Sequence, residues 1–274
     1  MSILTTITPY WNRPEMLTAW QIAVSSASTP NTRHLLLFAG ETPSFAYASG
    51  QMRVGIQVVT CPPPDGKSIG WYHNYGAEIA DTEWIMKLDV DCLPHQNYFK
   101  NLLPLLAEAK EREWFNGGML YTEKDFAESR LGISDLPITE ATYHAIMRGR
   151  SRRAVIGGSN FICRKADYLA TGGCDVRFSG YGWEDYYQLY LLEHNLLRRD
   201  PLQGTLTMEN VTIRCREELS RQKAVDLLMR DPSLCLLHKW HPPGPREGYR
   251  HPAIMQNNRT ILFETINRMR RYGR

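Results

Sequence analysis

Apolar and polar positions follow two different periods along the first third of the chain. Short β-branched or apolar runs predict strands at 3–8, 34–38, 55–61 and 84–89. Apolar residues at helical spacing predict helices between these strands, at 15–26 and 69–80. Strands that alternate with helices are typical of a parallel sheet with helices on both faces. The pattern therefore predicts an α/β fold, in which ligands bind at the carboxyl ends of the strands.

The rest of the chain is less regular. Its periodicity predicts helices at 98–112, 184–194, 219–229 and 261–271, and strands at 117–121 and 154–163. Residues 122–150 are expected to form a helix-containing insertion near an acceptor. The length allows one large α/β domain or two small ones, and we predict one domain over residues 1–274. The sequence has no internal repeat and no low-complexity tract. Within it we expect a nucleotide-binding half, an acceptor-binding half, and a C-terminal lid with a helix, at 1–95, 96–235 and 236–274.

Composition narrows the class of protein only a little. Of the 274 residues, 43% are hydrophobic and 22% are charged, which is ordinary for a globular protein. The net charge of +3 suits an anionic small ligand as well as a polyanion. No membrane span and no signal peptide are expected. The six cysteines are irregularly spaced, which favours reduced, mostly buried thiols in a cytoplasmic protein over disulfides or a zinc site.

Two carboxylates one residue apart follow the strand predicted at 84–89. Asp89 and Asp91 would place hard oxygen ligands at the mouth of the sheet, while Val90 points the opposite way, into the core. Such an arrangement suits Mg²⁺ or Mn²⁺ carrying a diphosphate. The alternative is a solvated acidic turn, since short Asp-x-Asp matches occur by chance in many proteins.

A second acidic segment lies far downstream. Gly180 and Gly182 allow the backbone to approach a ligand closely, and Trp183 offers a flat face for a sugar ring. Glu184 and Asp185 begin the helix predicted at 184–194, where one carboxylate could act as a general base on an attacking hydroxyl. The alternative is a helix start that merely carries favourable charges.

Two further segments could contribute to binding. His238 and His241 follow an apolar run, and either imidazole could supply a nitrogen ligand to Mn²⁺. The loop after them, with Arg246 and Arg250, could fold over a diphosphate. Lys67 precedes the helix that contains Asn74, a place suited to phosphate. Structural histidines, a surface loop and simple helix capping by Asp65 or Ser68 are the alternatives.

Basic residues gather at 148–153 and 268–274. They are either solvated or arranged for an acidic acceptor, a nucleic acid or a membrane surface.

Taken in order, these segments resemble the inverting nucleotide-sugar glycosyltransferases of the GT-A fold, particularly chondroitin-polymerase-type transferases and the galactosyltransferase C-terminal module. The resemblance is carried by Thr8, Pro9, Tyr10 and Arg13, and by the segments 69–74, 84–91, 157–161, 172–178, 180–185 and 237–238. It covers most of the chain and is weak at 105–150 and near the C-terminus. The chain departs from the family pattern at Tyr72-His73-Asn74, where Ala-Arg-Asn is frequent, and at Gly40-Glu41, where an Asp pair is usual.

The resemblance implies a Rossmann-like, mostly parallel sheet and a role for each matching residue. Nucleotide-sugar binding would fall to Thr8, Tyr10, Arg13, Glu41, Lys67, Asn74 and Asp89, the last at the ribose or the metal. Acceptor and sugar binding would fall to Gly158, Trp183 and Glu184. The metal ligands would be Asp91 and His238, and Asp185 would be the catalytic base.

We therefore expect a metal-dependent inverting hexosyltransferase. It would use Mn²⁺ or Mg²⁺ and a nucleoside-diphosphate sugar, with UDP favoured, and would transfer the sugar to a hydroxyl of a glycan or another acceptor. A nucleic-acid acceptor is possible but not favoured. Two alternatives stay open from the residues alone: a metal-dependent phosphohydrolase, and a non-catalytic binder of carbohydrate or nucleic acid.

Overall fold

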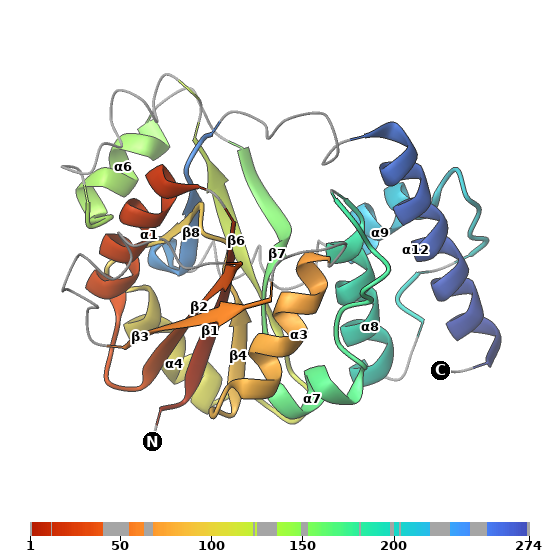
Figure 1. The fold of residues 1–274 in the computed structure, drawn as a ribbon, viewed down its shortest axis with the longest axis horizontal. Helices are drawn as coiled ribbons and strands as arrows, with labels where there is room; N and C mark the ends of the chain where they lie inside the picture. Colours follow the sequence, from red (N-terminus) through yellow and green to blue (C-terminus); the bar gives the residue numbers. More distant parts are fainter. Residues whose placement is uncertain are drawn as a thin grey trace.

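A single eight-stranded sheet crosses the molecule, in the strand order β3-β2-β1-β4-β7-β6-β8-β5 (Figure 1). The computed structural model describes residues 2–11, 13–40, 55–62, 68–122, 124, 136–148, 153–180, 182–197, 200–202, 204–219, 231–241 and 251–272. The structural statements below refer to these residues.

The first half of the sheet is parallel. Its strands are β1 (Leu4–Tyr10), β2 (Thr32–Ala39), β3 (Ile56–Cys61) and β4 (Trp84–Lys87). Helices α1 (Pro14–Ala27) and α3 (Ile69–Ile79) connect them. Pro14 at the first helical position suits the start of α1, because its fixed φ is helical and its missing N–H would have no partner there. Ser68 caps α3 by accepting a hydrogen bond from the Trp71 backbone N–H.

The second half of the sheet is mixed. Its strands are β5 (Cys92–Pro94), β6 (Phe115–Tyr121), β7 (Arg153–Arg164) and β8 (Cys235–His238). β7 is antiparallel to both β4 and β6, β8 is parallel to β6, and β5 is antiparallel to β8. The predicted α/β fold, with a Rossmann-like sheet between two helical layers, is confirmed. The parallel pairing on which the prediction rested holds throughout β3-β2-β1-β4.

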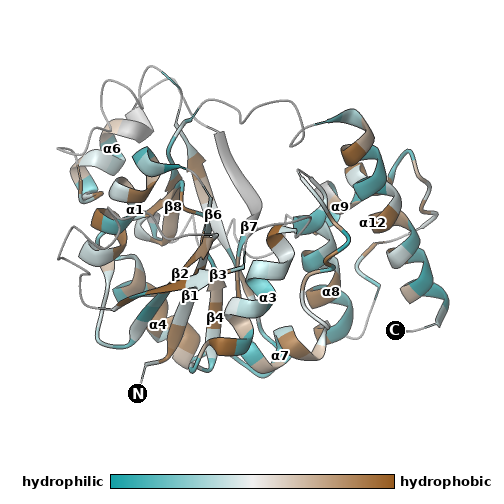
Figure 2. Ribbon diagram, viewed as in Figure 1, coloured by the Kyte–Doolittle hydropathy of each residue, from teal (hydrophilic) through white to brown (hydrophobic). Residues whose placement is uncertain are grey.

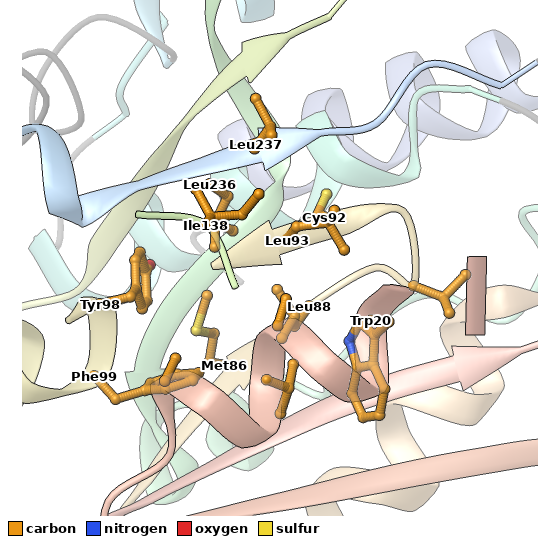
Figure 3. Packing of buried hydrophobic residues seen from close by; sticks show 14 of the residues in the cluster. Trp20, Met86, Leu88, Cys92, Leu93, Tyr98, Phe99, Ile138, Leu236 and Leu237 are labelled. Carbon is orange, nitrogen blue, oxygen red and sulfur yellow. The ribbon is translucent and has the colours of Figure 1, made fainter. Parts of the chain in front are cut away.

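Helices cover both faces of the sheet. One face carries α1 and α4 (Tyr98–Ala107), whose side chains pack with Met86 and Leu88 of the β4 region. Figure 3 shows Trp20 of α1 near Leu88 and Phe99 of α4 near Met86, with Leu93 and Leu236 further along the same cluster. A second cluster on the opposite face unites α3 with the later helices α7 (Lys165–Ala170), α8 (Glu184–Leu197), α9 (Val211–Glu218) and α12 (Pro252–Tyr272).

Burial explains why the strands have largely apolar sequences. β2 is buried along most of its length, as expected of a strand covered on both sides. Figure 2 shows β2 and β8 in hydrophobic colours, whereas α12 carries alternating hydrophobic and hydrophilic bands. The helix α6 (Glu140–Arg148) lies in the segment where a helix-containing insertion was predicted, and a short 3₁₀ helix, η2 (Pro232–Leu234), precedes β8.

Several boundaries differ from the prediction. α4 ends at Ala107 rather than at residue 112. A right-handed helix could not have included Arg112 in any case, because its φ is 64°. α12 begins at Pro252, nine residues before the predicted start, again with proline in the first turn. The sequence did not predict α7, α9 or β5. The helix predicted at 219–229, apart from Leu219, and most of the loop at 242–252 lie outside the described residues.

All six cysteines are buried and free, in agreement with the prediction of buried thiols. Among the described helices, none combines the length and the apolar character needed to cross a membrane.

Candidate functional site

The site lies where the strand order reverses. β1 and β4 are parallel neighbours, so their carboxyl ends meet at the same edge of the sheet. In sheets of this kind the crevice at such a reversal is where ligands bind. Tyr10 ends β1 and Arg13 follows it, while Lys87 ends β4 and is followed by Asp89 and Asp91.

Asp91 is the centre of a cluster of cationic and imidazole groups. Its Oδ2 atom accepts a hydrogen bond from Arg13 Nη1 at 2.7 Å. The Nε2 atoms of His241 and His238 lie 3.0 Å and 3.7 Å from the same oxygen. Strand register brings the histidines here: β8 pairs with β5 so that His238 stands opposite Cys92, and Lys239 N–H donates to the Asp91 carbonyl at 2.8 Å.

These three residues fit a divalent cation. Asp91, His238 and His241 each offer one ligand atom, and the three atoms lie within 4.8 Å of one another. A second set of candidate ligand atoms, from Asp89, Asp91 and Cys92, meets the same criterion and shares Asp91. Two imidazoles with a carboxylate suit Mn²⁺ better than Mg²⁺, which prefers oxygen ligands. Although burial opposes it, the His241 hydrogen bond and the charges of His238 and Arg13 hold the pKa of Asp91 well below its usual range. Burial lowers the pKa of His238, which favours the neutral form that binds metals.

A second group of carboxylates faces the tip of β4. Lys87, almost fully buried, donates through Nζ to Oδ1 of Asp185 at 2.6 Å. Burial, together with the charge of Asp185, raises the pKa of Glu184 to about 7. Burial likewise raises the pKa of Asp89 to about 7, although the Lys87 ammonium opposes the shift. The two acidic segments, far apart in sequence, therefore form one site.

A strained turn presents Glu184 and Asp185. Trp183 has a φ of 76°, an outlier for a bulky residue, and Gly182 has a φ of 106°. Asn258 of α12 secures the turn: its Nδ2 donates to the carbonyls of Ser179 at 2.7 Å and Gly182 at 3.1 Å, and its Oδ1 accepts from Ser179 N–H at 3.2 Å. The indole N–H of Trp183 donates to the Met255 carbonyl at 3.0 Å. The start of α8 is thus held by α12.

The predicted nucleotide-binding residues differ in their surroundings. Thr8 and Tyr10 are buried at the end of β1, and the Tyr10 hydroxyl accepts a hydrogen bond from Arg13 N–H at 3.1 Å. Asn74 lies in α3, and its side-chain amide makes hydrogen bonds with the backbone of Cys174 and with the Tyr168 hydroxyl. These bonds connect α3 to α7 and to the segment that follows it. The predicted place of Asn74 near the ribose and diphosphate stays a prediction.

Other predicted residues are described only in part. Gly158 lies within β7, and its role in acceptor binding stays a prediction. Glu41, Lys67 and the loop with Arg246 and Arg250 lie outside the described residues. The stacking of a sugar on Trp183 also stays a prediction; its ring stacks on Tyr186, with centroids 5.9 Å apart.

Two residues of the site were missed by the sequence analysis. Lys87 was assigned only to the predicted strand, although a charged residue at the end of an apolar strand, two positions before Asp89, could have been recognised as a pairing partner. Asn258 had no sequence feature that distinguished it from the other polar positions of its helix.

No family model and no curated protein matches the sequence. Similar solved structures include TarS residues 1–349 from S. aureus, at 13% identity and a TM-score of 0.45, covering 69% of this chain and 54% of that one. Another is the mannosyltransferase PcManGT from Pyrobaculum calidifontis in complex with GDP-Man and Mn²⁺, at 13% identity and a TM-score of 0.48, covering 90% of this chain and 58% of that one. The chain spans little more than half the length of these two solved chains, and 34% of a longer solved chain of TarS. At such values the function must be argued from the residues of the chain itself.

Proposed function

We propose that this protein is a metal-dependent inverting glycosyltransferase that moves a sugar from a nucleoside-diphosphate donor, UDP being favoured, to a hydroxyl acceptor. The observation that carries the proposal is the 2.6 Å contact between Lys87 and Asp185. It joins the candidate base on α8 to the strand end that leads into Asp89 and Asp91. One substrate can meet both a base and a metal ion only if the two lie at the same end of the sheet.

The donor side would be held by the edge of β1 and β4. Asp91, His238 and His241 would hold Mn²⁺, or alternatively Mg²⁺, and the metal when bound would supply positive charge to the diphosphate. Arg13, whose guanidinium already lies against Asp91, is placed to add charge-assisted hydrogen bonds to the same phosphates. Asp89 is the candidate partner for a ribose hydroxyl.

The acceptor side would be served by α8. Asp185 takes the proton of the acceptor hydroxyl as its oxygen attacks the anomeric carbon. The bond from that carbon to the diphosphate breaks on the opposite face, and the nucleoside diphosphate leaves with the electron pair. Attack opposite the leaving group inverts the configuration at this carbon. Glu184 and Trp183 are proposed to hold sugar or acceptor hydroxyls beside it.

The test is a donor screen with Mn²⁺ that detects released nucleoside diphosphate with and without acceptor sugars. Asp185→Asn should lower turnover by roughly 10²- to 10⁴-fold. Donor affinity, measured by calorimetry, should stay within about threefold, because the substituted group is assigned to the proton and not to the nucleotide. Substantial turnover in Asp185→Asn would refute its assignment as base.

Two results would favour other functions. Steady release of inorganic phosphate from nucleotides, with no dependence on an acceptor, would indicate a phosphohydrolase that uses the same carboxylates and histidines. Salt-sensitive binding of polyanions that is indifferent to a chelator, without donor cleavage, would indicate a non-catalytic binder.

A further inference from the structure

Lys87 is a charged side chain in an otherwise apolar strand. Its side chain is 6% exposed, and it follows the buried residues Trp84, Ile85 and Met86 of β4. A buried ammonium costs several kcal/mol unless partners compensate it. Its nearest partner, Asp185, is 98 residues away in sequence and belongs to a different layer of the fold. A packing role alone would be met by an apolar side chain.

The groups that face Lys87 come from several elements. Glu184 and Asp185 belong to α8, Asp89 follows β4, His73 belongs to α3, and Cys174 lies in the turn after α7. Burial opposes the charge, but the three carboxylates raise the pKa of Lys87, so it stays an ammonium. The lysine therefore provides positive charge to a group of acids that would otherwise repel one another.

The geometry distinguishes the two oxygens of Asp185. Lys87 contacts Oδ1, and the Asp185 side chain is 31% exposed, compared with 6% for Lys87. The ammonium thus approaches from the protein interior, whereas part of the carboxylate is open to solvent. A carboxylate held by one oxygen from behind has limited freedom to rotate.

We propose that Lys87 is a positioning residue for the transfer reaction: its ammonium holds Oδ1 of Asp185, so that Oδ2 faces the acceptor hydroxyl and receives its proton. This inference rests on the proposed function. The proton passes from the acceptor oxygen to Oδ2 and later to solvent, while Lys87 keeps its own protons throughout. Lys87 acts only through Asp185 and touches neither donor nor acceptor.

The test compares turnover and its pH profile in Lys87→Met, Lys87→Arg and the wild type. Lys87→Met should lower kcat about 100-fold, as expected for a misplaced reacting group, with the donor KM within about threefold. The acidic limb of the pH–rate profile of Lys87→Met should lie about one unit or more above that of the wild type, because the ammonium no longer favours the ionised carboxylates. Lys87→Arg keeps the charge and should return the limb toward the wild-type position.

A matched control separates positioning from general damage. Arg270→Met removes another partly buried ion pair, with Asp200, whose atoms lie 2.6 Å apart beyond the far end of α8. This variant should lose thermal stability without a shift of the acidic limb. If Lys87 were purely structural, Lys87→Met would likewise lose stability without a shift of the acidic limb. A pH–rate profile of Lys87→Met whose acidic limb matches that of the wild type therefore overturns the proposal.

A double-mutant cycle keeps the proposal testable if Lys87→Met folds poorly. In Lys87→Met/Asp185→Asn neither an unpaired buried cation nor its carboxylate partner remains. If Lys87 acts through Asp185, the double variant should turn over at the rate of Asp185→Asn alone. Additive losses overturn the inference while leaving the proposed function intact. Substantial turnover in Asp185→Asn, or no donor cleavage by the wild type, would overturn both.

Discussion

Arg13 and Asp91, 78 residues apart in sequence, form a 2.7 Å ion pair at the edge between β1 and β4. The same guanidinium nitrogen lies 3.2 Å from Nε2 of His241. His241 Nε2 also lies 3.0 Å from Asp91 Oδ2, so its tautomer decides whether it accepts from Arg13 or donates to Asp91. Binding of a metal ion would require the lone pair on this nitrogen. Arg13 therefore adds positive charge beside both Asp91 and His241.

Replacing Arg13 should weaken nucleotide binding without removing the metal. Arg13→Gln is expected to lower the affinity for UDP in the presence of Mn²⁺ by roughly 10- to 100-fold, because charge-assisted hydrogen bonds to phosphate are lost. Affinity for Mn²⁺ alone should be unchanged or higher, since a neighbouring positive charge is removed. Calorimetry measures both. Arg33→Gln, which alters an exposed pair with Asp81, is the control, and equal UDP affinities for the two variants would exclude Arg13 from the phosphate site.

The metal ligands can be assigned one by one. Asp91→Ala should abolish the dependence of UDP binding on Mn²⁺, and His238→Gln and His241→Gln should each weaken Mn²⁺ binding at least about 10-fold. Electron paramagnetic resonance of free Mn²⁺ gives the affinities directly. His144→Gln on α6 controls for adventitious binding of Mn²⁺ by an exposed histidine. An imidazole whose loss leaves the Mn²⁺ affinity unchanged does not belong to the ligand set.

The raised pKa of Glu184 predicts a pH dependence of stability. Burial raises the pKa of Glu184 to about 7 in the folded protein, above its pKa in the unfolded chain. The protonated carboxyl therefore contributes its full stabilisation at pH values below the unfolded-state pKa. This contribution is lost as the pH rises through about 7. Glu184→Gln stays neutral and should not suffer this loss. Its free energy of unfolding, relative to wild type, should therefore increase by roughly 1–3 kcal/mol between pH 4.5 and pH 8.

Urea denaturation across this range measures the difference. The exposed Glu108→Gln serves as a control, for which the difference should remain within about 0.5 kcal/mol. A Glu184→Gln curve parallel to the wild-type curve would contradict the prediction.

Asn258 offers a test of how the start of α8 is supported. Asn258→Ala removes three hydrogen bonds to the turn at 179–182 and leaves partly buried backbone groups of Ser179 and Gly182 without this partner. We expect a loss of roughly 1–3 kcal/mol in the free energy of unfolding, and a larger fall in kcat than in donor affinity. The neighbouring Asn257→Ala, at an exposed position of the same helix, should change neither. A stable Asn258→Ala variant with normal turnover would show that the turn holds its conformation unaided.

The sequence was informative where local pattern determines structure. The apolar run before Asp89 identified β4 and placed its carboxylates at the sheet edge, and the glycines before Glu184 identified the start of α8. The antiparallel return of β7 beside β4 was not predictable, because an apolar run does not encode the direction in which a strand pairs. The contact of Lys87 with Asp185 was also missed, because it spans 98 residues and depends on that return.

The bonds from Asn258 to the turn before α8 have a consequence for biosynthesis. Asn258, which secures this turn, comes long after β1 and β4 in the chain and is therefore made after them. A nascent chain can therefore assemble β1 and β4 long before Asp185, the proposed proton acceptor, is held in position. We expect transferase activity to arise only once α12 has left the ribosome and docked on the turn, so a chain arrested before α12 emerges should be inactive.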